Sequence, residues 1–351
     1  MKMLIQLFKM AHLVGLLFVV NSCDNDLNLI EPNNQPTPVV YGFLSMNDTA
    51  TYIRVERSFV DIKRSPIELA KIADSITYPA NVEVYLVRIK NNERYLLQKV
   101  DGNTEGYRRD TGVFVSAPNY LYKIKTSTLL LKSNEDWRVE VQRKGETKLI
   151  AKSETRVIGN YDITMAPVVS LDPSFPATFE ANETAQGKAD ADIAARFYSI
   201  NVLFNYEETV GTTTTKKQIK WVFSPNQARK GTPNPVYDQQ TFTQSGRNFY
   251  EFLGNNISVT AGAVRTFKDF DLEITAGGQE VIDLLNVGIA NLGITGSQTI
   301  PIYTNVEDGA KVKALGIFGS RNKFTKKGFK MTDPSLELLK NGPYTKQLNF
   351  R

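Results

Sequence analysis

The sequence predicts a mostly β chain, with an N-terminal immunoglobulin-like β-sandwich followed by a second β domain that carries short helical insertions. Two observations lead to this prediction. Apolar and polar residues alternate with a period of two through many short runs, and clusters of Asn, Asp, Gly and Pro separate these runs. The helical period occurs only in a few short segments between them, as expected for a sandwich with insertions.

Residues 1–22 have the composition of an export signal. Lys2 and Lys9 make its start positive, and the apolar run from Met10 to Val20 is about half the ~20 residues that span a bilayer. Ser22 precedes Cys23 in a pattern that resembles a bacterial lipobox. We therefore expect a lipoprotein signal peptide and lipidation of Cys23, because each buried lipid CH₂ adds about 0.8 kcal/mol of membrane affinity. The alternative is a plain secretory signal with an incidental cysteine.

Residues 23–38 are polar, acidic and rich in proline, which favours a flexible tether over a packed element. Asp24 and Asp26 follow Cys23 directly and resemble the surface-export signal of Bacteroidota lipoproteins. The expected location is therefore the outer membrane, with the body lipid-anchored and facing the cell exterior.

Residues 39–159 are expected to form the sandwich. Its strands are indicated by alternating apolar positions, among them Val82, Val84 and Leu86 in one run and Trp137, Val139 and Val141 in another. A short helix is expected over 66–73, because Ser65 suits the N-cap and Pro66 the first helical position.

Residues 160–351 are expected to form the second β domain. Three of its strands are indicated by apolar residues at alternate positions in 198–206, 219–223 and 270–274. Helices are expected near 247–253 and 279–292, where apolar residues recur near one helical face.

Two residue counts exclude several kinds of site. His12 and Cys23 are the only histidine and the only cysteine, and both precede the predicted body. A body without them has no Ser-His-Asp or Cys-His nucleophile, no HExxH zinc site, no CxxC pair and no disulfide. A net charge of only +5 on 351 residues argues against a nucleic-acid partner. We therefore expect no catalytic residue, no cofactor and no metal, and a protein that is not an enzyme.

One enzymatic alternative stays open. A glycosidase needs only two carboxylates a few ångströms apart, and Asp269, Asp271 and Glu273 alternate along a strand and would share one face. The same acids could offer oxygen ligands to Ca²⁺. The favoured interpretation is the solvated face of an amphipathic strand.

Carbohydrate binding would need an exposed aromatic platform. The candidates are Trp137, Trp221, Tyr237 and Tyr250. The two tryptophans fall on the apolar faces of their strands and are interpreted as core residues. Tyr237 lies in a segment rich in Pro and Asn and is the weak candidate for ligand binding. The pairs Lys216-Lys217 and Lys326-Lys327 are interpreted as solvated surface.

The C-terminal part contains an Asn-x-Glu-x-Gly turn over 305–309, followed by Gly-Ile-Phe-Gly over 316–319. Gly316 and Gly319 would allow close backbone approach while Phe318 packs, and Asn305 and Gly309 suit turn positions. This closing motif resembles that of an uncharacterised Bacteroidota lipoprotein family, catalogued as domain of unknown function 4249. Residues 310–313 lengthen the turn relative to the family. The resemblance implies an outer-membrane lipoprotein of two β domains, produced alongside TonB-dependent transporters, and supplies no catalytic residue.

The expected function is a lipid-anchored cell-surface binding or accessory lipoprotein, non-enzymatic, that cooperates with a TonB-dependent transporter in nutrient capture. Its expected partners are the membrane, through lipidated Cys23, and the transporter, with no nucleic acid. The alternative is a surface adhesin or glycan-binding lipoprotein without a transporter partner. The remote alternative is a carboxylate-based hydrolase.

Overall fold

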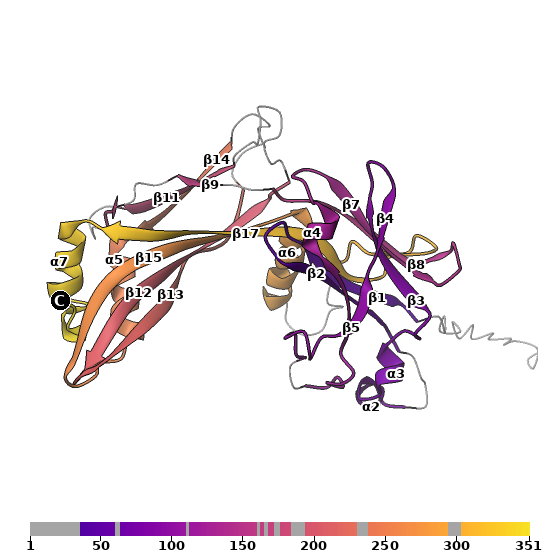
Figure 1. The fold of residues 1–351 in the computed structure, drawn as a ribbon, viewed down its shortest axis with the longest axis horizontal. Helices are drawn as coiled ribbons and strands as arrows, with labels where there is room; N and C mark the ends of the chain where they lie inside the picture. The colour runs from indigo at the N-terminus through magenta and orange to yellow at the C-terminus, as the bar shows by residue number, and fades with distance from the viewer. Residues whose placement is uncertain are drawn as a thin grey trace, which may run out of the picture. The chain divides into compact units, whose positions relative to one another are not determined.

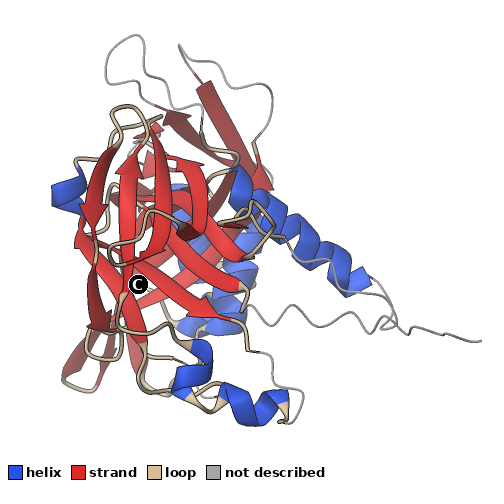
Figure 2. Ribbon diagram, turned by 90° about the vertical axis from the view of Figure 1, so that its right-hand side faces the viewer, coloured by secondary structure: helices blue, strands red, loops and turns tan. Residues whose placement is uncertain are grey.

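The computed structural model describes residues 36–59, 64–109, 112–159, 162–164, 168–171, 176–183, 194–229, 238–293 and 303–351. The predicted signal peptide and Cys23 lie outside these residues, as do most of the predicted tether and Tyr237. Strands dominate the described residues (Figure 2). The predicted class, a mostly β chain with an N-terminal immunoglobulin-like sandwich and a second β region carrying helices, is confirmed.

The N-terminal sandwich consists of two layers. The strands of one layer are β1 (Pro38–Leu44), β2 (Ala50–Arg57), β6 (Tyr120–Lys125), β5 (Gln98–Asp101) and the first part of β17 (Leu315–Met331). The strands of the other are β16 (Glu307–Asp308), β8 (Leu149–Arg156), β7 (Asp136–Arg143), β3 (Val82–Arg88) and β4 (Glu93–Leu96). Alternate apolar residues of both layers meet in one core, including Val40 of β1, Ile53 of β2, Leu86 of β3 and Trp137 of β7.

Three short helices accompany the sandwich: α2 (Pro66–Ala70), α3 (Ala73–Ile76) and α4 (Thr126–Leu129). The predicted helix over 66–73 is shorter than expected and ends at Ala70. The Ser65 hydroxyl caps it as expected, accepting from the Ile67 N–H at 3.3 Å. Ile72 then takes extended backbone, so α3 begins separately.

The second β region is built on four long strands: β12 (Phe197–Val210), β13 (Thr213–Ala228), β15 (Ala263–Gly277) and the last part of β17 (Figure 1). One face of this sheet packs against α5 (Gly246–Asn256) and α7 (Asp333–Asn341) in a second core that contains Phe204, Trp221 and Phe270. The remaining elements are β9 (Asp162–Thr164), β10 (Val168–Val169), β11 (Pro176–Glu183), β14 (Asp238–Ser245), α6 (Gln279–Gly293) and the 3₁₀ turn η2 (Lys346–Leu348). The helices predicted near 247–253 and 279–292 are confirmed as α5 and α6.

Strand β17 belongs to both cores. It pairs in parallel with β1 from Leu315 to Ser320 and antiparallel with β15 from Arg321 to Phe329. Residues Thr37–Arg351 accordingly form one compact unit, separate from Met1–Pro36. The boundary predicted after residue 159 describes this packing only in part, because Val306, Ala314 and Phe318 return to the first core.

Two polar side chains of β17 fix the place where the chain passes between the cores. The buried Ser320 hydroxyl accepts from the Ile158 N–H at 2.9 Å and donates to the Leu44 carbonyl at 3.1 Å. The buried Asn322 amide donates to the Gly159 carbonyl at 2.5 Å. These bonds attach the segment that leaves the sandwich to the middle of β17.

The closing motif is structural, as interpreted. Gly316 has φ of +106°, and a Cβ there would lie 1.9 Å from the Val40 carbonyl oxygen. Phe318, two residues on, is fully buried in the first core. Glycine is therefore required for β17 to approach β1 at this point.

Among the described helices, none is long and apolar enough to cross a membrane.

Candidate functional site

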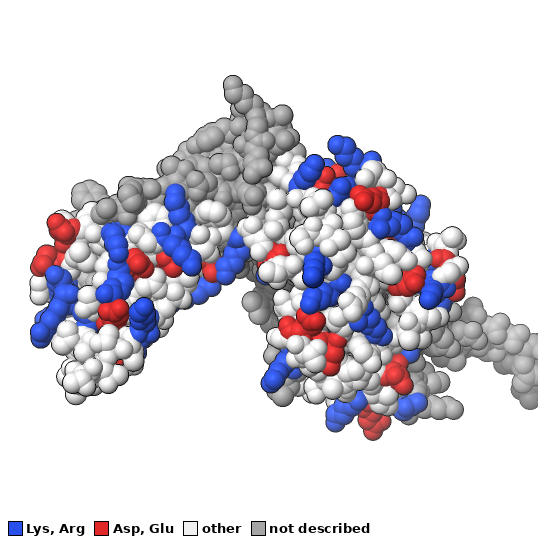
Figure 3. All heavy atoms as spheres, viewed as in Figure 1, with Lys and Arg blue, Asp and Glu red and all other residues white. Residues whose placement is uncertain are grey.

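The four-stranded sheet of the second region has a polar face opposite α5 and α7, which we call the polar outer face. It arises because alternate residues of each strand point away from the core. Its central residues are Asn201, Asn205, Gln218, Lys220, Asp269, Asp271, Glu273 and Lys323. Figure 3 shows basic side chains gathered over the second region, with acidic ones between them.

The structure brings Asp269, Asp271 and Glu273 onto this face, as their spacing predicted. Asn205 Nδ2 donates to Asp269 Oδ1 at 2.8 Å and is 3.4 Å from Asp271 Oδ2. The Gly328 N–H donates to Asp271 Oδ1 at 3.0 Å. Asp271 and Glu273 are largely buried rather than solvated, so the favoured interpretation of a fully solvated strand face is corrected: neighbouring side chains cover these two acids.

Two lysines hold Glu273: Lys323 from β17, which pairs with β15, and Lys220 from β13, which lies two strands away. Lys220 Nζ lies 3.1 Å from Glu273 Oε1, and Lys323 pairs with the other carboxylate oxygen. Burial alone would raise the pKa of Glu273, but the hydrogen bonds and charges of Lys323 and Lys220 outweigh it and lower the pKa below the ordinary value. A glycosidase general acid needs the opposite, a raised pKa. Glu273 is therefore suited to pairing with the ammonium groups of Lys220 and Lys323 rather than to donating a proton.

One end of the polar outer face is hollowed. The hollow has a volume of about 550 Å³ and combines lysines, amides and carboxylates; its lining residues include Asn205, Lys216, Gln218, Lys268, Asp269 and Lys330. Lys268 Nζ pairs with Glu207 at 3.0 Å, and Gln218 Nε2 donates to Asn205 Oδ1 at 2.8 Å. Such a mixture of donors and acceptors can bind a hydroxylated or anionic small molecule through several hydrogen bonds.

Sequence reasoning missed this hollow. Lys216 and Lys217 were interpreted only as solvated surface, yet both line it. Asn205, Gln218 and Asp269 occupy alternate positions on three strands, and this polar alternation was visible in the sequence. Their meeting depends on the register that sets Asn205 opposite both Gln218 and Asp269, which one sequence does not reveal.

The two tryptophans expected in the core lie there, whereas Tyr250, a candidate for the exposed platform, is buried as well. Trp137 is fully buried in the first core, and Trp221 and Tyr250 are buried in the second. Within the described part of the chain, no group of three or more His, Cys, Asp or Glu side chains is placed to hold a metal ion.

A second hollow, of about 320 Å³, lies where β7 and β8 of the sandwich approach the start of α6. Its lining includes Arg156, Arg196 and Glu280. The Thr155 hydroxyl donates to Glu280 Oε1 at 3.1 Å. Burial raises the pKa of the Glu280 carboxyl, against the weaker effect of this and other hydrogen bonds.

No protein-family model matches this chain, and no curated protein does. Among solved structures, the chicken CNTN1 FN1–FN3 domains match at 8% identity and a TM-score of 0.20, over 70% of this chain and 59% of that one. The chicken interferon gamma receptor alpha chain matches at 8% identity and a TM-score of 0.17, over 70% of this chain and 89% of that one. The chain thus spans about three fifths of the CNTN1 structure. With TM-scores this low, the fold assignment depends on the strand pairing and the two cores.

Proposed function

We propose that this protein is a lipid-anchored lipoprotein of the outer membrane and cell surface, non-enzymatic, that binds a nutrient for a TonB-dependent transporter. The lipobox-like sequence before Cys23 and the acidic, proline-rich residues behind it support the anchor. The compact unit begins at Thr37, immediately after that polar stretch. Thr37 is fastened at once, since its N–H donates to Ser58 Oγ and its carbonyl accepts from the Ser58 N–H, both at 2.8 Å.

The observation that supports a binding role best is the hollow on the polar outer face. It lies on four hydrogen-bonded strands backed by an aromatic core, so its lining is held in place before any ligand arrives. Its lysines and amides suit a small ligand with hydroxyl or acidic groups. The transporter partner is supported by the family resemblance of the closing motif.

The first experiment is affinity purification of the tagged chain, with Cys23 intact, from gently solubilised outer membranes, followed by mass spectrometry. A stoichiometric transporter barrel is the expected companion. A Cys23→Ser chain is the matched control and should lose both the membrane fraction and the barrel. Reproducible recovery of the intact chain without a companion would contradict the accessory role.

A glycan-binding lipoprotein without a transporter is the second candidate. The amide and carboxylate groups of the hollow favour it, because such groups commonly bind sugar hydroxyls. Glycan screening of the Cys23→Ser chain tests it, with Asn205→Ala and Gln218→Ala expected to weaken binding and the exposed Asn91→Ala expected not to. Tyr237→Ala tests the candidate chosen from the sequence.

A further inference from the structure

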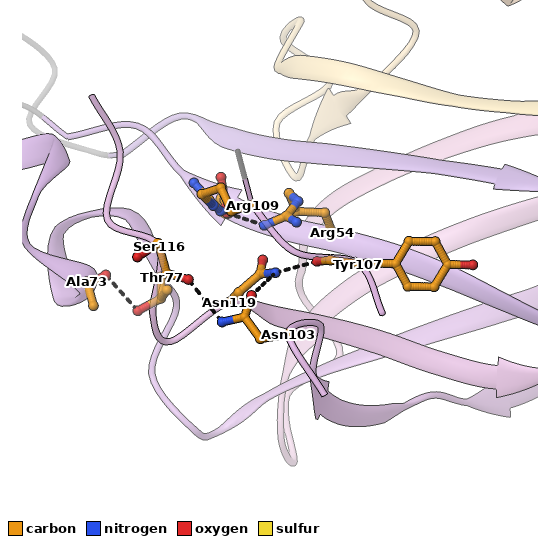
Figure 4. Close-up of polar contacts among 9 residues, drawn as sticks. Arg54, Ala73, Thr77, Asn103, Tyr107, Arg109, Ser116 and Asn119 are labelled. Atoms are coloured by element: carbon orange, nitrogen blue, oxygen red, sulfur yellow. Dashed lines mark hydrogen bonds and ion pairs between the residues drawn. The ribbon is translucent and has the colours of Figure 1, made fainter. Parts of the chain in front are cut away.

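The connection between β5 and β6, residues 102–119, is long for a hairpin, and polar contacts hold its described parts, 102–109 and 112–119 (Figure 4). The Asn119 side chain is fully buried, and its Nδ2 donates to the Tyr107 carbonyl at 2.7 Å and to Asn103 Oδ1 at 3.2 Å. Asn103 Nδ2 donates in turn to the Ser116 carbonyl at 3.0 Å. Long connections that are held by such contacts in compact domains are usually functional.

Further contacts attach this loop to the sheet. Glu105 accepts from the Tyr52 hydroxyl at 2.8 Å and from Lys123 Nζ at 2.6 Å. Arg109 pairs with Glu56 on β2. The Tyr107 ring lies 4.5 Å from the Tyr52 ring, measured between centroids. These contacts hold the first arm of the loop, residues 102–109, against β2 and β6.

The second arm of the loop, described from residue 112, exposes apolar side chains at its start. Val113 is 48% exposed and Phe114 is 49% exposed. The adjoining Val115 N–H donates to the Ala70 carbonyl at 3.0 Å, so the segment lies against the end of α2. Ile67 and Ile72 of that neighbourhood are also exposed. We call Ile67, Ile72, Val113 and Phe114 the apolar end; exposed apolar groups on adjoining segments usually mark a contact surface.

The apolar end is linked by short contacts to the residue where the tether joins the body. Thr37 is hydrogen-bonded to Ser58, and the preceding Arg57 donates from Nη2 to the Asp74 carbonyl of α3 at 2.6 Å. The same α2–α3 segment carries Ile67 and Ile72. The face that bears the apolar end therefore adjoins the attachment point of the predicted lipid tether.

Charged groups surround the apolar end. Arg64, Lys71 and Arg108 are exposed there, as are the acids Glu68 and Asp74. Basic residues beside apolar and aromatic ones are typical of protein segments that lie at a membrane surface. The tether residues 24–36 reach at most about 45 Å when extended, so an acylated Cys23 would keep Thr37 within that distance of the lipid.

We propose that the apolar end rests on the lipid surface that holds the anchor, with Ile67, Ile72, Val113 and Phe114 at headgroup level. This inference rests on the proposed lipid anchor. The occupant is the bilayer interface rather than a protein, because these residues adjoin the attachment point of the tether. The body would then have one fixed orientation on the membrane.

The test uses the full chain purified with its lipid and reconstituted into phosphatidylethanolamine–phosphatidylglycerol vesicles. Acylation occupies the thiol of Cys23, so a single introduced cysteine is the only reactive one. Ile67→Cys, Val113→Cys and Phe114→Cys are each labelled with an environment-sensitive fluorophore, and shallow spin-labelled lipids serve as the quencher. Val259→Cys, at a position 65% exposed in the second region, is the matched control.

The expected result is a blue-shifted emission and at least twofold stronger lipid quenching at positions 67, 113 and 114 than at 259. Vesicle flotation tests the lipid anchor separately from the membrane contact of the apolar end. A chain that floats but whose labels at 67, 113 and 114 behave like the label at 259 would overturn the membrane contact and leave the anchor intact. A chain that does not float would overturn both. Labels shielded from water without lipid quenching would indicate a protein contact instead and overturn the assignment to lipid.

Discussion

The side-chain amide of Asn305 pairs with the backbone of Phe318, donating to its carbonyl at 2.7 Å and accepting from its N–H at 3.0 Å. The side chain thus takes the place of one residue of a neighbouring strand. The Asn305 carbonyl also accepts from the Ser153 hydroxyl at 2.8 Å. Asn305 therefore joins β17 to β8. It lies before the turn, which the structure places at 309–310 rather than over 305–309.

Asn305→Ala should lower the free energy of unfolding by about 1–3 kcal/mol, because it leaves the N–H and carbonyl of a buried residue without partners. Urea unfolding followed by tryptophan fluorescence measures this. Asn91→Ala, which removes an exposed amide contact with Glu93, is the control and should change little. An Asn305→Ala chain as stable as wild type would contradict the role given to this amide.

Gly316→Ala should destabilise the protein by more than about 2 kcal/mol, because it adds a steric clash with β1 to the strain of a positive φ. Gly328 separates the two effects: its φ is +85°, but a Cβ there meets no atom within 4 Å. Thermal unfolding of both variants checks this. Equal losses for Gly316→Ala and Gly328→Ala would mean that the close approach to Val40 is unimportant.

Arg265 and Glu208 form a buried ion pair, with Nη2 2.5 Å from Oε2. Arg265 also donates to the carbonyls of Leu348 at 2.6 Å and Ser258 at 2.8 Å, so it holds the C-terminal segment against the sheet. Arg265→Met should cost about 3–5 kcal/mol, since it removes one of the two cations that pair with the buried Glu208 carboxylate, Lys217 being the other, and takes the donor away from two carbonyls. Arg247→Met breaks an exposed pair with Glu251 and should cost at most about 1 kcal/mol. Denaturant unfolding compares them.

The lowered pKa of Glu273 predicts a pH-dependent contribution to stability. The folded pKa lies below the unfolded value, taken as 4.5, so stabilisation is present above that pH and is lost as pH falls through the folded pKa. Glu273→Gln should therefore be less stable than wild type at pH 7, and the difference should shrink towards pH 3. Melting temperatures measured across this range test it, and a difference independent of pH would contradict the pairing with Lys220 and Lys323.

Glu280 should behave in the opposite way. Burial raises the pKa of Glu280 above 4.5, so the folded state favours the protonated carboxyl. The stabilisation that this protonation gives the folded state is fully present below pH 4.5 and is lost as pH rises through the folded pKa. Glu280→Gln keeps an acceptor for Thr155 and should be more stable than wild type at pH 7 and equal to it at pH 4 or below. Lower stability of Glu280→Gln at pH 7 would show that the charged carboxylate is needed.

The fold could be predicted largely because a two-residue period is legible in sequence alone. The alternation around Trp137 and around Phe270 correctly gave the buried faces of β7 and β15. The same alternation placed Asp269, Asp271 and Glu273 together. It could not show that Asp271 and Glu273 are buried, since the lysines that cover Glu273 come from β13 and β17, about 50 residues away on either side.

The candidate sites were less accessible to prediction. The hollow depends on the register of three strands, and the apolar end depends on a contact between Val115 and Ala70. In sequence, Val113 and Phe114 are two apolar residues in a loop, and α2 is an unremarkable short helix. Only tertiary contacts bring Val113 and Phe114 next to α2, and a single sequence does not reveal such contacts.

The sharing of β17 between two cores has an evolutionary consequence. Domains joined by a linker can be recombined, duplicated or replaced one at a time, whereas here neither half has a complete sheet without the other's strand. A one-residue insertion between Ser320 and Lys323 would invert the facing of every later side chain in β17 and expose Phe329. Sequence length should therefore drift in the loops of this protein while this strand keeps its length, and the two halves should be inherited as a pair.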